Sequence, residues 1–429
     1  MRTYWNLIIC LATALALMLS VSAGVSAGIT LTMTMWGNQP QKELFDKLAA
    51  EFAESDPEVD RIVITQISTQ YRDKLAVMVA GGTPPDIMLL DSFNSKEAFA
   101  AGWTLDLEPL LARGEIDVDD FFEPFWDGVM YNGHRYGLPI WGGGFRTDVY
   151  AINKQLFDNY GLQQPRPTAN PDQAWTFAEF INAVRTLTQD LNGDNRPDQF
   201  GYVPGRWFSW VFSNGGSILS EDRRKCVLDQ PEAYSAIQML GDLQNVYHVT
   251  SVAANFYSGR VGVLSTLYPN VALLRQQISR GGDFDWYLAH QPQGVAGSVG
   301  YAKMNVISIA KSTPHMEAAW RFVKFFTGRH AAEVMTTNYV SAPWLKSVAF
   351  STRFITSSEP PYDMSPNVFG NSRPLPLVIN WNGIAAVWDK AVQEINSGNV
   401  PAQSALYDAC RQINAILDET AAKTAGPLY

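Results

Sequence analysis

The amino-acid sequence predicts an α/β protein that folds into two lobes. With 429 residues, the chain is longer than one hydrophobic core usually organises, so we expect at least two domains. Strand-like and helix-like segments alternate between residues 30 and 90, and a second alternation with unrelated sequence begins near residue 148. Such an order is typical of mostly parallel sheets whose two faces are covered by helices. We expect several chain crossings between the lobes.

Three strands and two helices make up the first alternation. Residues 30–36 alternate strictly between polar and apolar side chains, which is the pattern of a half-buried strand. Leu44, Leu48 and Phe52 recur at helical spacing. The other predicted elements, in chain order, are a strand at 61–67, a helix at 71–80 and a wholly apolar strand at 87–90. A strand without polar side chains is expected where helices cover both faces of a sheet.

The second alternation supplies further elements with recognisable starts and ends. Thr176 and Glu179 form the capping-box pattern of a helix N-terminus. Thr313, followed by Pro314, is expected to start another helix, which Gly328 ends. The remaining predicted helices are residues 231–247, 384–397 and 402–417, and the remaining predicted strands are 148–153, 261–267 and 305–310.

The N-terminus has the pattern of an export signal. Arg2 precedes an apolar run at residues 7–21, which is too short to span a bilayer comfortably and is followed by small residues. We predict a signal peptide at residues 1–27, cleaved after Ala27, and therefore a periplasmic protein. An uncleaved membrane anchor is the alternative.

Charge and side-chain chemistry narrow the function. A net charge of −10 argues against nucleic acid or an anionic membrane surface as the partner. The sequence has no zinc-protease motif and no phosphate-binding glycine loop, so we expect no metal and no cofactor. Residues 190–198 imitate the start of an EF-hand loop, but Gly201 stands where the bidentate Glu is needed, so an acidic turn is the simpler interpretation. After export, Cys226 and Cys410 can form a disulfide or remain two separate thiols.

Several short motifs, taken in order, resemble those of the family 1 extracellular solute-binding proteins, which include maltose-binding and other sugar-binding proteins. The motifs are GGTPPDI at 81–87, YGLP at 136–139, INKQLF at 152–157, AWTFAEF at 174–180, FYSGRV at 256–261 and AAWRFVKF at 318–325, together with the strand ending at Trp36 and the helix after it. Each motif is weak alone, and their order and spacing together are specific. The resemblance covers nearly the whole chain after residue 27.

This resemblance implies two lobes joined by a multi-strand hinge, with a ligand in the cleft between them. It also implies an ABC importer, to whose permease subunits in the inner membrane the closed protein delivers its ligand. We place the first lobe at residues 28–140 and 286–328 and the second at residues 141–285 and 329–429. We expect a monomer that binds a mono- or oligosaccharide and performs no chemistry.

Sugar recognition needs flat aromatic rings for the C–H faces of the sugar and multivalent polar side chains for its hydroxyls. After the first strand, Trp36 is a stacking candidate, and Asn38 and Gln39 are candidates for hydroxyl binding. Asp91 directly follows the apolar strand and is expected at the mouth of the cleft. The alternatives are a core position for Trp36 and a helix N-cap role for Asp91.

The remaining candidates are nearer the hinge and in the second lobe: Trp141, Trp207, Tyr268, Gly300, Tyr301 and Trp344. Trp141 precedes three glycines, which suit close approach to a ligand or simply a pliable crossing. The family position favours Trp207 as a stacking residue, whereas Trp210 and Trp388 are expected in the core.

Three other functions stay open at this point. The first is a solute-binding protein whose ligand is a polyol, a glycerophosphodiester or a peptide instead of a sugar. A secreted glycan-active enzyme is an alternative because a catalytic carboxylate pair is spatial and cannot be recognised from spacing. A binding protein that signals to a sensor is the third.

Overall fold

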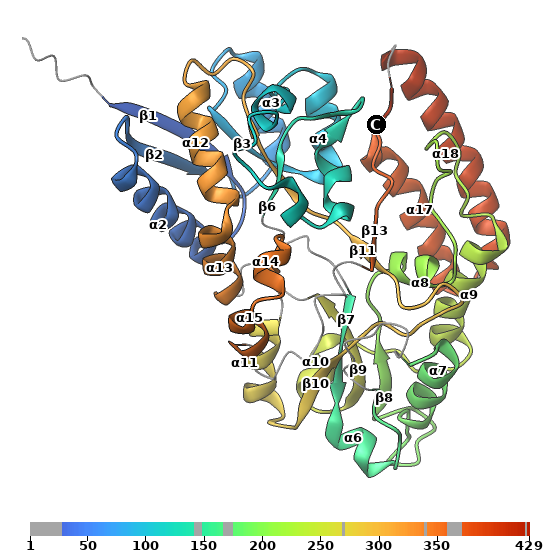
Figure 1. Ribbon diagram of the computed structural model, residues 1–429. Helices are drawn as coiled ribbons and strands as arrows, with labels where there is room; N and C mark the ends of the chain where they lie inside the picture. Colours follow the sequence, from blue (N-terminus) through green and yellow to red (C-terminus); the bar gives the residue numbers. More distant parts are fainter. Residues whose placement is uncertain are drawn as a thin grey trace, which may run out of the picture.

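The structure is a computed structural model that describes residues 28–140, 148–165, 175–267, 271–338, 341–357, 371–424 and 427–429. Two separate sheets, each packed against helices, form the upper and lower parts of the molecule in Figure 1. The predicted two-lobed α/β fold is therefore confirmed. Within the described residues, no helix has the length and apolarity needed to cross a membrane. The predicted signal peptide lies outside them.

The first sheet has the strand order β2-β1-β3-β12-β6. Its strands are β1 (Ile29–Met35), β2 (Val59–Gln66), β3 (Ile87–Asp91), β12 (Asn305–Ile309) and β6 (Leu138–Ile140). β1 pairs in parallel with β2 and β3, as the βαβαβ order predicts, whereas β12 runs antiparallel to β3 and β6. This difference arises because β12 returns from the other lobe and does not belong to a local βαβ unit.

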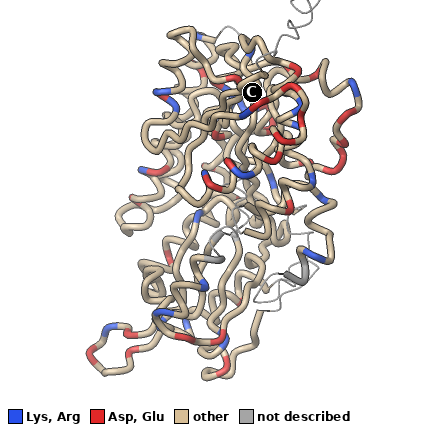
Figure 2. The backbone as a smooth tube through the Cα atoms, turned by 90° about the vertical axis from the view of Figure 1, so that its left-hand side faces the viewer, with Lys and Arg blue, Asp and Glu red and all other residues tan. Residues whose placement is uncertain are grey.

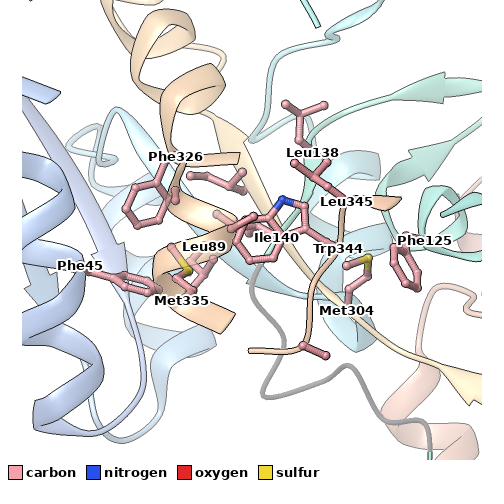
Figure 3. Close-up of a cluster of buried hydrophobic side chains, with 14 of the residues drawn as sticks. Phe45, Leu89, Phe125, Leu138, Ile140, Met304, Phe326, Met335, Trp344 and Leu345 are labelled. Carbon is pink, nitrogen blue, oxygen red and sulfur yellow. The ribbon is translucent and has the colours of Figure 1, made fainter. Parts of the chain in front are cut away.

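Strand β3 shows how the first sheet is buried on both faces. Its Ile87 and Leu89 belong to one hydrophobic cluster, and Met88 and Leu90 belong to another. Successive side chains of a strand point to opposite faces, so an unbroken apolar run buries both. Helices α2 (Gln39–Ser55) and α12 (Met316–Thr327) contribute to the first cluster, and α3 (Tyr71–Ala80) and α4 (Ser92–Ala100) to the second. Figure 3 shows Leu89 near the α2 and α12 phenylalanines of the first cluster.

Shorter elements complete the first lobe. They are α5 (Glu108–Leu111), the 3-10 helices η1 (Val118–Asp120) and η2 (Glu123–Val129), the paired strands β4 (Met130–Tyr131) and β5 (His134–Arg135), and, after α12, the helices α13 (Arg329–Thr337), α14 (Lys346–Ala349) and α15 (Thr352–Ser357). Buried residues of α13 and α14 belong to the same cluster as α2 and α12.

The second sheet has the order β10-β7-β9-β8. Its strands are β7 (Asp148–Asn153), β8 (Phe200–Val203), β9 (Val261–Leu267) and β10 (Trp286–Ala289), and only β8 and β9 pair in parallel. Helices α10 (Ala253–Tyr257) and α11 (Val271–Gly281) lie on the face to which Leu264 points. The opposite face carries the second large core, which includes Val263 and residues of α6 (Lys154–Asn159), α7 (Phe177–Thr186), α8 (Phe208–Ser213), α9 (Pro231–Asn245), α17 (Trp381–Asn396) and α18 (Ala402–Thr424).

The chain crosses between the two lobes beside a short pair of strands. β11 (Gly300–Ala302) pairs in parallel with β13 (Ser372–Pro374), and Figure 1 shows both strands between the two parts of the molecule. Tyr301 belongs to the second core, whereas Met304 belongs to the first. The crossing after β11 is therefore made within a few residues.

The predicted lobe boundaries differ from these contacts in two places. β10, which we expected in the first lobe, pairs with β7 of the second sheet. α13 and α14, which we expected in the second lobe, pack in the first cluster with α12. Both segments lie next to a crossing between the lobes. No local sequence pattern shows at which residue the chain leaves one lobe for the other.

Most predicted elements occur where the sequence placed them, with two clear differences: one helix starts later than expected, and the C-terminal helix predicted at 402–417 continues to Thr424. The capping box is confirmed, because Thr176 Oγ1 accepts from the N–H of Glu179 and the Glu179 carboxylate accepts from the N–H of Thr176. The helix predicted to start at Thr313 begins instead at Met316. The Thr313 hydroxyl donates to Asp86 Oδ1 at 2.5 Å and is thereby held against the first sheet.

A disulfide joins Cys226 to Cys410, with an Sγ–Sγ distance of 2.03 Å. Of the two alternatives from sequence, the bridge is the one observed. It links the segment between α8 and α9 to α18, across a sequence separation of 184 residues. Cross-linking so distant a pair restricts the unfolded chain and thereby stabilises the fold.

Candidate functional site

A cavity of about 480 Å³ lies where β1 and β3 end. Trp36 follows β1 and Asp91 ends β3, and both line this cavity. The two strands pair in parallel, so their carboxyl ends meet at one edge of the sheet. The full lining consists of Trp36, Tyr71, Arg72, Leu75, Leu90, Asp91, Phe93, Asn94, Glu97, Ala98, Ala101 and Trp103. The structure thus brings together two residues that the sequence singled out separately.

Aromatic rings form much of the wall. Trp36 is half-buried, and its ring meets that of Tyr71 edge-on with centroids 4.9 Å apart. The Tyr71 hydroxyl donates to the carbonyl oxygen of Leu89 at 2.6 Å and lies 2.9 Å from Thr34 Oγ1. These bonds fix the start of α3 to β1 and β3, and burial raises the pKa of Tyr71 above its ordinary value. The ring that supports Trp36 is therefore held in place.

Asp91 has two structural partners at the edge of the cavity. Its Oδ1 accepts from the N–H of Phe93 at 2.8 Å, so Asp91 is the N-cap of α4. Its Oδ2 accepts from the ammonium of Lys303 at 2.8 Å. The Asp91 side chain is still 30% exposed, and each carboxylate oxygen has two lone pairs, so it keeps acceptor capacity toward the cavity.

The polar rim of the cavity touches the second lobe. Arg72 of α3 and Glu97 of α4 form an ion pair, and Glu97 Oε1 also accepts from the N–H of Asn380 at 3.1 Å. Asn94 Oδ1 accepts from the Asn382 amide at 2.7 Å. Asn380 and Asn382 flank the first residue of α17, which packs in the second core. The cavity therefore adjoins the contact between the lobes.

Asn38 and Gln39 lie near the end of β1 but do not line the cavity. Asn38 caps α2: its Oδ1 accepts from the N–H of Gln41 at 3.0 Å, and Gln41 accepts from the N–H of Asn38. Gln39 donates to Glu43 at 3.1 Å. Both residues are exposed, so the structure separates them from Trp36 and Asp91.

Three predicted aromatic residues are buried in the cores. Tyr301 and Trp344 are 0% exposed and Trp207 is 7% exposed. Trp344 Nε1 donates to the carbonyl oxygen of Thr327 at 2.7 Å, and Figure 3 shows its ring among the side chains of the first cluster. Trp207 packs on Phe208, with ring centroids 4.3 Å apart. None of these rings lines the cavity at Trp36.

The other predicted residues divide into three groups. Gly300 begins β11 and pairs with Ser372 of β13, away from the cavity lining. Trp141 and Tyr268 lie outside the described residues. The two expected core tryptophans, Trp210 and Trp388, are each 1% exposed, as predicted.

Most residues of the cavity wall were not predicted from the sequence. Tyr71, Phe93 and Trp103 line the cavity, and the ammonium of Lys303 donates a hydrogen bond to Asp91. Tyr71 opens α3 and Phe93 stands in the first turn of α4, each next to the edge where a parallel strand ends. Aromatic residues at the starts of such helices were the available signal. No local pattern pointed to Lys303, because 212 residues separate it from Asp91.

Charge is spread over the surface instead of marking a second site. In Figure 2, Lys and Arg are intermixed with Asp and Glu over both parts of the molecule. In the acidic loop, Asp190 accepts from the N–H groups of Gly193 and Asn195, and Asp198 accepts from that of Leu191. Among the described residues, no group of three or more His, Cys, Asp or Glu side chains is placed to hold a metal ion.

Comparisons with known proteins identify a family and relatives for this chain. A family model for bacterial extracellular solute-binding proteins matches residues 36–333. The maltotriose-binding protein of Pyrococcus abyssi (strain GE5 / Orsay) is 21% identical over 310 residues, which cover 69% of this chain and 62% of that protein. The chain therefore spans less than two thirds of that relative's length.

Solved structures of similar shape include two from bacteria. An ABC substrate-binding protein from Listeria monocytogenes, in complex with cycloalternan, has a TM-score of 0.76 at 21% identity and covers 91% of this chain and 99% of its own. The sugar-binding protein MalE from Xanthomonas citri has a TM-score of 0.78 at 16% identity and covers 91% of this chain and 98% of its own. At these identities the similarity establishes the fold alone.

Proposed function

Because the chain belongs to the bacterial extracellular solute-binding proteins, we propose that it binds a mono- or oligosaccharide between its lobes and delivers it to the permease of an ABC importer. One observation carries the proposal. Trp36 and Asp91 share a cavity that also presents the rings of Tyr71, Phe93 and Trp103. The rings supply faces for sugar C–H groups, and the carboxylate accepts hydroxyl hydrogen bonds.

The size and position of the cavity support this function. Its volume of about 480 Å³ falls within the range of roughly 300–1,000 Å³ that is usual for small-molecule sites. The second lobe already contacts α4, and a hinge rotation about this contact would cover a ligand that rests on the first lobe. Glucose-based oligosaccharides are the first candidates, since one relative is named for maltotriose and one similar structure contains cycloalternan.

Isothermal titration calorimetry tests the proposal. The chain from residue 28 onward is titrated with maltotriose, cycloalternan and a monosaccharide, and with a polyol, a glycerophosphodiester and a short peptide as rival ligands. We expect one of the sugars to bind with a micromolar Kd, which corresponds to about −8 kcal/mol. If none of the sugars binds at millimolar concentration, the sugar assignment is wrong.

A matched pair of tryptophan variants tests the cavity itself. Trp36→Ala should weaken sugar binding about five- to thirtyfold, because a stacked aromatic ring contributes roughly 1–2 kcal/mol. Trp286 in β10 is also half-buried but lies in the other sheet, so Trp286→Ala should leave the Kd unchanged. If the two substitutions change the Kd equally, the cavity at Trp36 is not the sugar-binding site.

We also propose that the protein releases its ligand chemically unchanged. A binding protein returns its ligand unaltered, whereas a glycan-active enzyme would cleave it. Incubation of the protein with maltotriose and with an aryl glycoside, followed by product analysis, separates the two. Release of glucose or of the aryl alcohol above the buffer rate would replace the binding function with a hydrolase.

We further propose that the protein is exported to the periplasm and loses residues 1–27. The family is extracellular, and the Cys226–Cys410 disulfide suits an oxidising compartment. N-terminal sequencing of the protein from a periplasmic extract should begin at Gly28. Recovery of the intact N-terminus from the membrane fraction would instead support an uncleaved anchor.

A further inference from the structure

Lys303 occupies an unusual place for a charged side chain. It lies between β11, which pairs with β13 beside the second core, and β12, which belongs to the first sheet. Its side chain is only 7% exposed. A buried ammonium is costly unless it is paired, so its partners are expected to matter.

The partners of Lys303 belong to the cavity wall. Its Nζ donates to Asp91 Oδ2 at 2.8 Å and lies 3.6 Å from the centroid of the Phe93 ring. Asp91 and Phe93 both line the cavity, and Asp91 also caps the helix on which Phe93 stands. Lys303, at the crossing between the lobes, therefore contacts two residues that line the cavity.

Phe93 extends this contact into the second lobe. Its ring stacks on that of Trp381 with centroids 5.9 Å apart and planes inclined by 24°. Trp381 begins α17, is 1% exposed and packs against Trp388 at 4.8 Å. The path from Lys303 through Phe93 to Trp381 thus joins the crossing, the cavity and the second core by direct contacts.

We propose that Lys303 is a positioning residue that couples the cavity wall to the arrangement of the lobes. The ammonium holds the Asp91 carboxylate at the cavity edge and attracts the Phe93 ring, which in turn meets Trp381. A rotation of the lobes about the crossing changes the contact between Phe93 and Trp381, and Lys303 holds Phe93 and Asp91 on the first-lobe side of that contact. A ligand that contacts Asp91 or Phe93 therefore changes the energy of the rotation. The part that concerns ligand affinity rests on the proposed function.

The first test measures the lobes without any ligand. The two cysteines among the described residues form the disulfide, so spin labels can be attached to Glu54→Cys in α2 and Val246→Cys after α9, both at exposed positions in different lobes. Pulsed electron resonance then gives the interlobe distance distribution. Lys303→Met keeps an unbranched side chain that is one atom shorter and removes its charge, and it should broaden or shift the distribution. Lys303→Arg should retain the distribution of the parent protein.

The matched control is Lys311→Met, which removes an exposed lysine shortly after β12. It should leave the distances unchanged. An unchanged distribution in Lys303→Met overturns the inference. Thermal melting of each variant checks that the lobes remain folded, and rescue by Lys303→Arg distinguishes loss of the charge from a general packing defect.

The second test measures maltotriose binding by calorimetry. Loss of a charge-assisted contact behind Asp91 should raise the Kd about tenfold in Lys303→Met, with a value near that of the parent in Lys303→Arg. Altered distances with unaltered affinity would also overturn the coupling, since the lobe arrangement and the cavity would then be independent. If the parent protein binds none of the sugars, the proposed function fails, while the distance measurement still decides whether Lys303 sets the arrangement of the lobes.

Discussion

Arg223 of the second lobe forms an ion pair with Asp127 of the first lobe, and the two side chains are only 15% and 17% exposed. Arg223 also donates to the carbonyl oxygen of Leu377 at 2.9 Å, and its guanidinium lies 4.6 Å from the centroid of the Tyr429 ring. This contact between the lobes is separate from that of Phe93 with Trp381. The lobes are therefore held by at least two independent sets of side chains.

Breaking the Arg223–Asp127 pair should destabilise the protein. Asp127→Ala leaves a largely buried guanidinium without its carboxylate, and we expect a loss of roughly 2–3 kcal/mol in the free energy of unfolding, measured by urea titration. The exposed pair Arg411–Asp408 supplies the control, and Asp408→Ala should change stability by less than about 0.5 kcal/mol. Equal losses in the two variants would show that Arg223 finds an adequate partner elsewhere.

Reduction of the disulfide should lower stability strongly. Cys226 and Cys410 close a long loop, for which the chain-entropy relation gives up to about 5 kcal/mol. We expect a lower melting temperature in the presence of dithiothreitol. The double variant Cys226→Ala, Cys410→Ala should melt near the reduced protein and should not respond to the reductant. A melting temperature that reductant does not change in the parent protein would contradict this prediction.

Lys96 should make stability depend on pH in the alkaline range. Its ammonium is buried in the first lobe and donates to the carbonyl oxygens of Asp127, at 2.7 Å, and Met130. Burial lowers the pKa of Lys96 from 10.5 to about 8, while the nearby Asp127 opposes and Arg223 reinforces the decrease. Between these two pH values the unfolded chain holds the proton and the folded chain does not, so the contribution of Lys96 to stability rises with pH.

The measurement compares the parent protein with Lys96→Met by urea unfolding from pH 7 to 10.5. The difference in unfolding free energy should stay flat up to about pH 8 and then grow in favour of the parent. Lys390 is 78% exposed at its side chain, so Lys390→Met controls for the removal of a lysine charge from the surface. A flat difference for Lys96→Met would show that its pKa is not lowered.

Tyr71→Phe should affect both stability and the site. The substitution removes the hydroxyl that donates to Leu89 and contacts Thr34, with an expected loss of about 1–2 kcal/mol in the free energy of unfolding. Because Trp36 rests edge-on against this ring, the Kd for maltotriose should rise as well. Tyr407 is 57% exposed, so Tyr407→Phe serves as the control and should alter neither quantity. Unchanged binding in Tyr71→Phe would mean that the ring alone fixes Trp36.

The sequence predicted the parts of the fold that local periodicity determines. The helix at Tyr71–Ala80 and the apolar strand before Asp91 occur as expected, because their side-chain spacing is set by neighbours in the chain. The proximity of Trp36 and Asp91 could also be predicted from the sequence, because the carboxyl ends of parallel strands lie at one edge of a sheet. By contrast, β12 was predicted as a strand, but its antiparallel place beside β3 depends on a distant crossing.

The wall of the cavity was harder to foresee because its contacts are long-range. Phe93 meets Trp381 and Lys303 only after both lobes have formed. The burial of Trp344 had the same origin: its indole N–H finds the carbonyl oxygen of Thr327, which no local pattern connects with it. Whether Trp141 and Tyr268 reach a ligand stays a prediction.

The ring contact between Phe93 and Trp381 also gives the protein an optical reporter of its own state. If the lobes part, the indole of Trp381 exchanges an aromatic neighbour for solvent, and its emission moves to longer wavelength. The chain contains 13 tryptophans, so the difference between the spectra of the parent protein and of Trp381→Phe reports on Trp381 together with its neighbour Trp388. Stopped-flow recording of that difference would follow the opening of the molecule in real time without an attached dye.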